Sequence, residues 1–221
     1  MPDLDGPRWG PADGGAPGRI VVLLHGYGAD GNDLIDLAHR WSPAVPDALF
    51  IAPHAPGRVP DTVFGRQWWD LSDRAPARME AGVRAVGPVL DAFVARECAA
   101  AGVPESRVAL AGFSQGAMTA LFHGLRRPVA PAAILAFSGY LIAPETLAAE
   151  VRSRPPVLLV HGEADEVVPV AGSRAAESVL RAAGVPVEAA YSPRLGHGMD
   201  EAGLSLAAIA LQRAAAAASA G

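Results

Sequence analysis

The sequence contains no lysine, since all 18 of its basic residues are arginine. This absence excludes a Schiff-base lysine, a P-loop and a Ser-Lys catalytic dyad, because each of these sites needs a lysine side chain. Only one cysteine, Cys98, is present, so no disulfide can form within the chain. We therefore expect a reducing compartment, the cytoplasm, and we interpret Cys98 as a packing residue on a predicted helix.

Membrane and targeting signals are also missing. No apolar run approaches the length of a transmembrane helix, and the first residues lack the basic and apolar regions of a signal peptide. The net charge of -5 and the pI near 5.6 argue against nucleic acid as a partner and against stable association with an anionic membrane. No set of His, Cys, Asp or Glu residues has metal-ligand spacing, so we expect no metal and no other cofactor.

The 221 residues are 51% hydrophobic, which suits one α/β domain over residues 1–221. Strands and helices are predicted to alternate, and the strands are continuously apolar, which is typical of a mostly parallel sheet covered by helices on both faces. The predicted strands are 20–24, 49–52, 108–111, 132–137, 157–160 and 185–191, and the predicted helices are 32–40, 77–101, 117–125, 144–151, 171–183 and one from about 200. We expect residues 1–18 to form an extended arm or edge strand, and residues 214–221 to fray.

The stretch from Val108 to Met118 organises the predicted fold. An apolar strand ends in Gly112-Phe113-Ser114-Gln115-Gly116, and a helix-compatible run follows. Strand, tight turn and helix form the context in which G-x-S-x-G is a nucleophile elbow. Glycines two residues before and after the serine avoid collisions in the crowded turn, and Ser114 is the candidate nucleophile. We expect no metal-dependent chemistry at this turn.

A serine hydroxyl needs a histidine in contact with it, and the histidine needs a carboxylate. In this architecture the chain order is serine, acid, histidine, and His197 is the only histidine beyond the acid candidates. Asp165 is the favoured acid because the apolar residues Val167-Val168-Pro169 after it indicate that the chain turns back toward the core there. Glu163 and Glu166 are the alternatives, which we expect to be solvated, and we interpret His25 and His161 as structural hydrogen-bonding residues.

Two backbone amides are needed to bind the oxyanion of an acyl-transfer reaction. The amide of Gln115, at the start of a helix, is one candidate. The other is the amide of Tyr27, in the loop after the first buried strand. Residues 53–76 form a long segment without clear periodicity, and such a segment is usually functional. Its aromatic residues Phe64, Trp68 and Trp69 are candidate substrate-binding residues, together with Met118, although simple packing beneath the segment is the alternative for the aromatics.

Four motifs, in order, resemble the phospholipase/carboxylesterase family of α/β-hydrolases, which includes bacterial carboxylesterases and acyl-protein thioesterases. They are the run 24–34 around His25-Gly26-Tyr27-Gly28, the run 112–118, His161-Gly162-x-x-Asp165-x-x-Val168-Pro169, and Gly196-His197-Gly198. The resemblance extends from about Gly18 to Leu211. It implies an α/β-hydrolase fold, the triad Ser114, Asp165 and His197, and an oxyanion hole of the Tyr27 and Gln115 amides. It also places 67–70 beside the acyl pocket.

The expected function is hydrolysis of a small-molecule carboxylic ester with a small to medium acyl chain, through an acyl-enzyme. Thioesterase or lysophospholipase activity would use the same residues and is the alternative. Thioesterases of the family usually carry leucine where this chain has Tyr27, which weakens that alternative without removing the backbone donor. A noncatalytic binding module and a metal-dependent hydrolase are the remaining alternatives, and activity that survives chelation would remove the second. The sequence leaves a homodimer open.

Overall fold

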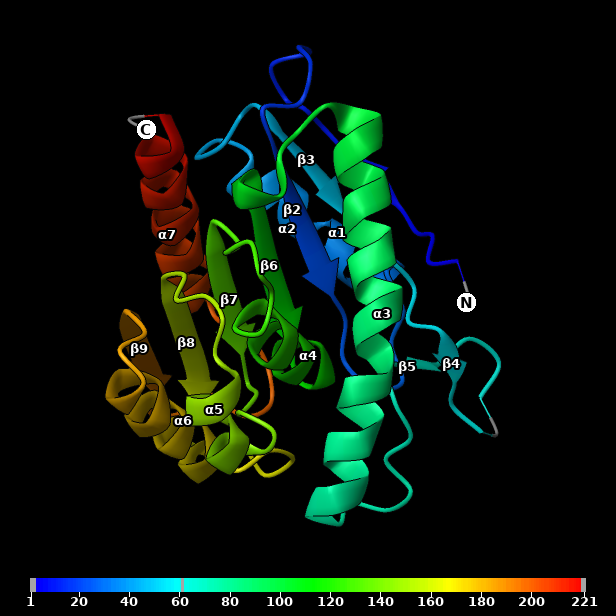
Figure 1. Cartoon of the computed structure of the whole chain (residues 1–221), viewed down its shortest axis with the longest axis vertical. Coiled ribbons are helices and arrows are strands. Elements are labelled where there is room, and N and C mark those ends of the chain that lie inside the picture. The colour runs from blue at the N-terminus through cyan, green and yellow to red at the C-terminus, as the bar shows by residue number, and fades with distance from the viewer. Residues whose placement is uncertain (1–2, 61, 220–221) are drawn as a thin grey trace.

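The computed structural model describes residues 3–60 and 62–219, which build a seven-stranded sheet between two layers of helices (Figure 1). The strands of the sheet are β1 (Arg8–Trp9), β2 (Arg19–Leu24), β3 (Ala48–Ile51), β6 (Val108–Phe113), β7 (Ala133–Phe137), β8 (Val157–Gly162) and β9 (Val187–Ser192). Their order is β1-β3-β2-β6-β7-β8-β9. All neighbours pair in parallel except β1, which pairs antiparallel with β3.

Helices cover both faces of this sheet, as the apolar strands predict. One face carries α3 (Pro76–Ala101), α4 (Gln115–Gly124), α5 (Leu147–Glu150) and α6 (Val170–Ala182), and the other carries α1 (Asn32–Ile35), α2 (Leu37–Trp41) and α7 (Glu201–Ser219). Alternate side chains of β2 serve the two layers: Val22 packs toward α3 and α4, whereas Val21 packs toward α2 and α7. Two short 3-10 helices, Glu105–Arg107 and Pro144–Thr146, complete the helical elements.

Three expectations need correction. The helix predicted over 32–40 is divided into α1 and α2, and Gly31 stands at the N-cap of α1. Segment 53–76 is not without regular structure, because β4 (Gly57–Arg58) and β5 (Arg66–Gln67) pair as a hairpin. Residues 214–219, which we expected to fray, continue α7, whereas 220–221 lie outside the described residues.

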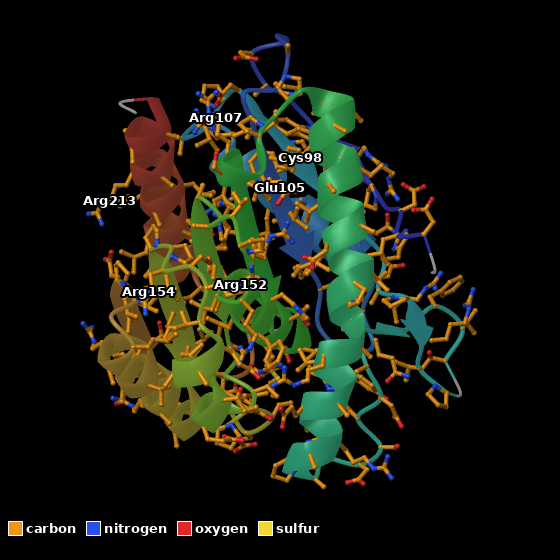
Figure 2. All side chains as sticks on the ribbon, in the orientation of Figure 1. Cys98, Glu105, Arg107, Arg152, Arg154 and Arg213 are labelled. Atoms are coloured by element: carbon orange, nitrogen blue, oxygen red, sulfur yellow. The ribbon has the colours of Figure 1, made fainter. Side chains whose placement is uncertain are left out.

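Several local predictions agree with the structure. The edge strand expected near the N-terminus is β1, although residues 1–2 of that arm lie outside the described part of the chain. Helix α3 ends at Gly102, whose φ of 68° is the left-handed conformation that favours glycine. Cys98 lies buried near the end of the same helix (Figure 2). No helix in the described ranges is long and apolar enough to cross a membrane.

Candidate active site

Ser114 occupies the sharp turn between β6 and α4. Its φ of 54° and ψ of -116° are rare for a residue with a side chain. The Ser114 N–H donates to the Phe137 carbonyl over 2.8 Å, which ties the turn to β7. A Cβ on Gly112 would lie 2.3 Å from the backbone of Gly116, and a Cβ on Gly116 would lie 1.8 Å from the Leu24 carbonyl oxygen. Close packing of the turn against α4 and β2 therefore requires both glycines.

His197 and Asp165 are joined by a hydrogen bond of 2.7 Å between Nδ1 and Oδ2. The other carboxylate oxygen accepts the N–H groups of Val167 and Val168 over 2.9 and 2.8 Å. Burial alone would raise the pKa of Asp165, but the hydrogen bonds from His197, Val168 and Val167 outweigh it and lower the pKa. The resulting carboxylate holds the proton of His197 on Nδ1, so Nε2 is the nitrogen that can accept another proton.

A second histidine lies behind the same carboxylate. His161 is fully buried, and its Nε2 lies 2.8 Å from the Val168 carbonyl and 3.2 Å from Asp165 Oδ2. Because a carbonyl can only accept, Nε2 carries the proton. Nδ1 of His161 is buried and has no hydrogen-bond partner among the described residues. His161 thus supports the loop of Asp165, which agrees with the structural role expected for it.

The loop that carries His197 is fitted closely against two strand ends. Ser138, which follows β7, donates its hydroxyl to the Gly198 carbonyl over 3.2 Å. Gly162, at the end of β8, allows the loop to approach, since a Cβ there would lie 2.2 Å from the Leu195 carbonyl. The histidine is therefore positioned by backbone packing as well as by its carboxylate.

The amides of Tyr27 and Gln115 both lie at the pocket beside Ser114. Neither N–H has an acceptor within residues 3–60 and 62–219, so both can receive a ligand oxygen. The loop of Tyr27 is held by His25, whose Nδ1 donates to the Gly26 carbonyl over 2.8 Å and whose Nε2 accepts the Ala55 N–H over 2.9 Å. Burial lowers the pKa of His25 and keeps its ring neutral, as these two bonds require.

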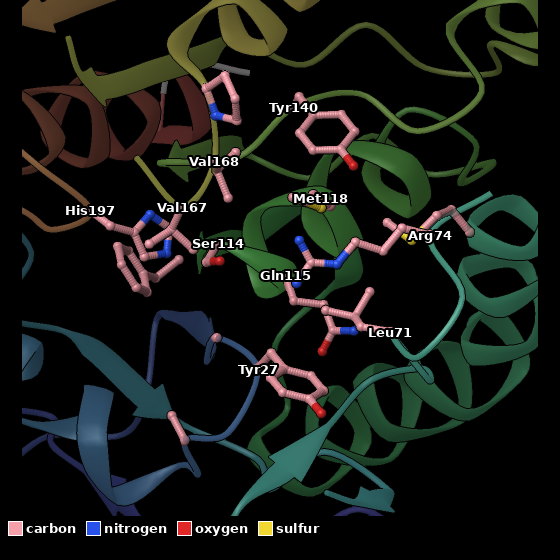
Figure 3. A pocket seen from close by; sticks show the side chains of 15 residues that line it. Tyr27, Leu71, Arg74, Ser114, Gln115, Met118, Tyr140, Val167, Val168 and His197 are labelled. Atoms are coloured by element: carbon pink, nitrogen blue, oxygen red, sulfur yellow. The ribbon is translucent and has the colours of Figure 1, made fainter. Parts of the chain in front are cut away.

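A pocket of about 320 Å³ opens over Ser114 at the carboxyl ends of the parallel strands (Figure 3). Ser114, His197, Tyr27 and Gln115 all line it. Its walls are mostly apolar, and the other side chains that Figure 3 labels there are Leu71, Arg74, Met118, Tyr140, Val167 and Val168. Within the described ranges, no three His, Cys, Asp or Glu side chains are grouped so as to hold a metal ion.

Of the four candidate substrate-binding residues, only Met118 lines the pocket. Phe64 is 77% exposed on the hairpin loop, and Trp68 and Trp69 are buried away from the pocket wall. The assignment of these three aromatics to the pocket is therefore wrong. The alternative of simple packing holds for the two tryptophans, because aromatic residues in a loop signal burial but not the cavity that they face.

The tryptophan segment instead supports the elbow. Gln115 Oε1 accepts the Trp68 N–H over 2.9 Å, and Gln115 Nε2 donates to the Trp69 carbonyl over 2.8 Å. The Trp68 indole N–H also donates to the His25 carbonyl over 2.9 Å. These buried bonds connect the loop of Tyr27, the elbow and the start of the segment that leads to α3.

Leu71, Arg74 and Tyr140 line the pocket, and sequence reasoning missed all three. Tyr140 follows the end of β7 by three residues, so the rule that sites form at the carboxyl ends of parallel strands could have found it. Arg74 and Leu71 precede α3 in a polar stretch, and no sequence signal distinguishes them from solvated loop residues.

Comparison with known proteins agrees with this geometry. A model of the phospholipase/carboxylesterase family matches residues 12–213. The chain belongs to that family. The family and the α/β-hydrolase fold expected from the four motifs are confirmed, and so is the expectation of an ester hydrolase.

Individual family members and solved structures extend the comparison. The crystal structure of esterase PE8 is 45% identical in sequence, has a TM-score of 0.90, and the match covers 96% of this chain and 99% of that one. Esterase YpfH of Escherichia coli (strain K12) is 29% identical over 86% of this chain and 80% of its own length. Acyl-protein thioesterase 1 of Neurospora crassa is 29% identical over 80% of this chain and 79% of its own length.

Proposed function

We propose that this family member is a serine carboxylesterase that hydrolyses small-molecule carboxylic esters of small to medium acyl chain through an acyl-enzyme. The observation that carries the proposal is the 2.7 Å hydrogen bond between His197 Nδ1 and Asp165 Oδ2, in a pocket that His197 shares with Ser114. That bond prepares Nε2 to act as a base beside a hydroxyl that is otherwise too weak a nucleophile.

In the first half of the reaction, Ser114 Oγ attacks the ester carbonyl carbon while His197 Nε2 takes the hydroxyl proton. The carbonyl oxygen becomes an oxyanion, which the amides of Tyr27 and Gln115 bind. The tetrahedral intermediate then breaks its bond to the alcohol oxygen, and His197 gives that oxygen the proton. The products of this half are the free alcohol and an ester between Ser114 and the acyl group.

In the second half, His197 takes a proton from water, and the hydroxide attacks the acyl-enzyme carbonyl. The same two amides bind the new oxyanion, and collapse returns the proton from His197 to Ser114 Oγ while the carboxylic acid leaves. Asp165 stabilises the protonated imidazole in both halves. Loss of one oxyanion donor typically lowers the rate of such reactions ~10²–10³-fold, so the Tyr27 loop is nearly as important as the triad.

A fluorophosphonate probe tests this proposal directly, because it reacts with an activated serine. We expect rapid labelling of Ser114, complete loss of labelling in Ser114→Ala, and retained labelling in Ser153→Ala. Ser153 is a matched control because its side chain is also buried. Its hydroxyl donates to the Gly124 carbonyl at the end of α4 that is away from the elbow. Failure of the wild type to react would favour the noncatalytic binding module instead.

Thioesterase and lysophospholipase activity remain the second candidate, supported by the similarity to acyl-protein thioesterase 1. Hydrolysis rates for p-nitrophenyl esters of graded chain length, an acyl-CoA and a lysophospholipid separate these substrate classes. We expect the short and medium esters to give the highest kcat/KM. Activity should also survive a chelator, because the proposed residues need no metal.

We further propose a reducing, cytoplasmic location. Cys98, the only cysteine, lies buried on α3, and burial raises the pKa of its thiol. A chain without a possible internal disulfide does not need an oxidising compartment. Fractionation of cells that express the protein would test this location.

A further inference from the structure

Arg74 extends from the segment before α3 into the active-site pocket (Figure 3). Arg74 is exposed to solvent, and within residues 3–60 and 62–219 its guanidinium makes no hydrogen bond and no ion pair. Many other arginines of the chain are paired, for example Arg19 with Asp47 at 2.7 Å and Arg126 with Glu150 at 2.7 Å. An unpaired cation in a substrate pocket is a ready partner for an anionic group of the substrate.

No aspartate or glutamate among the described residues lines this pocket. Asp73 lies 3.8 Å from Arg78. Glu145 borders a second hollow of about 380 Å³ that Arg74 also lines, but no ion pair joins these two side chains. Asp165 is hidden behind His197 and is already engaged by it.

The position of Arg74 relative to the triad decides which part of an ester it can reach. His197 must protonate the departing alcohol, so the alcohol lies on the side of His197. Figure 3 shows Arg74 and His197 on opposite sides of Ser114. Arg74 therefore faces the acyl part of the substrate.

We propose that Arg74 binds a carboxylate at the far end of the acyl group, so that the preferred substrates are monoesters of dicarboxylic acids. This inference rests on the proposed function. The guanidinium fork matches a carboxylate in two parallel hydrogen bonds. Hydrolysis adds water across the ester bond, and it releases the alcohol and the dicarboxylate.

The surroundings of Arg74 fit an acyl group of this kind. Met118, Met79 and Leu71 line the same pocket, and they offer apolar contact to methylene groups between the ester carbonyl and the carboxylate. An acyl group with a polar end and an apolar middle matches these walls and the cation together. A purely aliphatic acyl group would leave the cation without a partner.

Two ethyl esters of equal length and nearly equal volume test the proposal. Monoethyl adipate carries a terminal carboxylate, and its amide analogue, ethyl 6-amino-6-oxohexanoate, carries a neutral amide. The rate of acid release gives kcat/KM for each, and their ratio is the readout. For the wild type we expect a ratio of about five in favour of the anionic ester at low salt, as an ion pair with an exposed guanidinium allows. The ratio should fall as ionic strength rises.

Arg74→Gln should bring the ratio to about one, and Arg74→Glu should bring it below one. Arg78→Gln is the matched control, because it makes the same change of charge four residues away on an exposed part of α3, and its ratio should equal that of the wild type. A wild-type ratio near one, or a ratio unaltered by Arg74→Gln, would overturn the proposal.

The same experiment keeps this inference separate from the proposed function. Ser114→Ala must abolish hydrolysis of both esters, and the fluorophosphonate must label the Arg74→Gln variant. If these two results hold while the ratio stays near one, the esterase mechanism stands and the role of Arg74 is wrong. If Ser114→Ala remains active, the proposed function itself is wrong.

Discussion

Replacing Asp165 by asparagine keeps the shape of the side chain but removes its charge. In the native structure, one carboxylate oxygen accepts two backbone N–H groups, from Val167 and Val168, and the other faces His197 and His161. The two backbone donors require an oxygen, so the amide NH₂ of an asparagine would point to the histidines. His197 Nδ1 would then have to accept a hydrogen bond, and its proton would move to Nε2.

A histidine with its proton on Nε2 cannot take the proton of Ser114. In a serine protease of the Ser-His-Asp type, the same substitution lowers kcat about 10⁴-fold for this reason. At about 1.36 kcal/mol for each factor of ten, that loss corresponds to roughly 5.5 kcal/mol of transition-state stabilisation. The tautomer argument transfers to this site because the backbone donors dictate the orientation of the asparagine amide, and we expect a loss of similar size.

The assay is kcat for a p-nitrophenyl ester at pH 7.5, with circular dichroism to show that the variant is folded. Asp200→Asn is the matched control. Asp200 lies three residues from His197, but its carboxylate accepts the Ser192 hydroxyl over 2.6 Å and the Gly203 N–H over 2.8 Å at the start of α7. We expect Asp200→Asn to change stability little, because asparagine caps a helix about as well as aspartate, and to leave kcat within a few-fold of the wild type.

The reasoning would be refuted if Asp165→Asn kept more than a tenth of the wild-type kcat. It would also be refuted if Asp200→Asn lost activity to the same degree while remaining folded. The first result would mean that the hydrogen bond of 2.7 Å does not set the tautomer of His197, and the second that the loss of activity is not specific to the carboxylate of Asp165.

Three further changes have defined outcomes. Gly116→Ala places a Cβ 1.8 Å from the Leu24 carbonyl, so α4 must move; the Gln115 amide moves with it, and steady-state assays should show kcat/KM reduced ~10²-fold or more. Gln115→Met keeps the volume of the side chain but leaves the buried Trp68 N–H and Trp69 carbonyl without partners. Urea unfolding should therefore show that the free energy of unfolding falls by about 3 kcal/mol. Burial lowers the pKa of His123 from 6.5 to about 4, so the unfolded chain binds the proton first as pH falls, and stability should decrease by roughly 3 kcal/mol between pH 6.5 and 4. In His123→Gln, urea unfolding should show that this decrease in the free energy of unfolding between pH 6.5 and 4 is lost.

The parts of the fold that sequence predicts well are those with local causes. The strands on either side of Ser114 are continuous apolar runs, and both of their faces are buried in the structure. The turn at Ser114 was predictable because its glycines are required by contacts within the motif and with the adjoining strand. His197 was predictable from chain order alone, since its loop follows the last strand of a parallel sheet.

The helix expected over 32–40 was mispredicted for a nonlocal reason. Gly31, at its start, packs so closely on β3 that a Cβ there would lie 1.9 Å from the Ala52 carbonyl. Asp33 bonds within the turn before the helix, where its carboxylate accepts the Asp30 N–H over 2.7 Å. Tertiary packing decided the start of this helix, and composition cannot report such packing.

The resemblance placed 67–70 beside the acyl pocket, but Leu71 and Arg74, which line the pocket just beyond, escaped prediction because their position depends on a buried tether. The Gln115 side chain holds the backbone at Trp68 and Trp69, and five residues later the chain emerges at the pocket with Arg74. In the proposed mechanism Gln115 also offers its backbone amide to the oxyanion. Under that proposal, one residue connects the oxyanion donor to the segment that carries Arg74. A change in the Gln115 side chain should therefore alter acyl preference through the position of that segment.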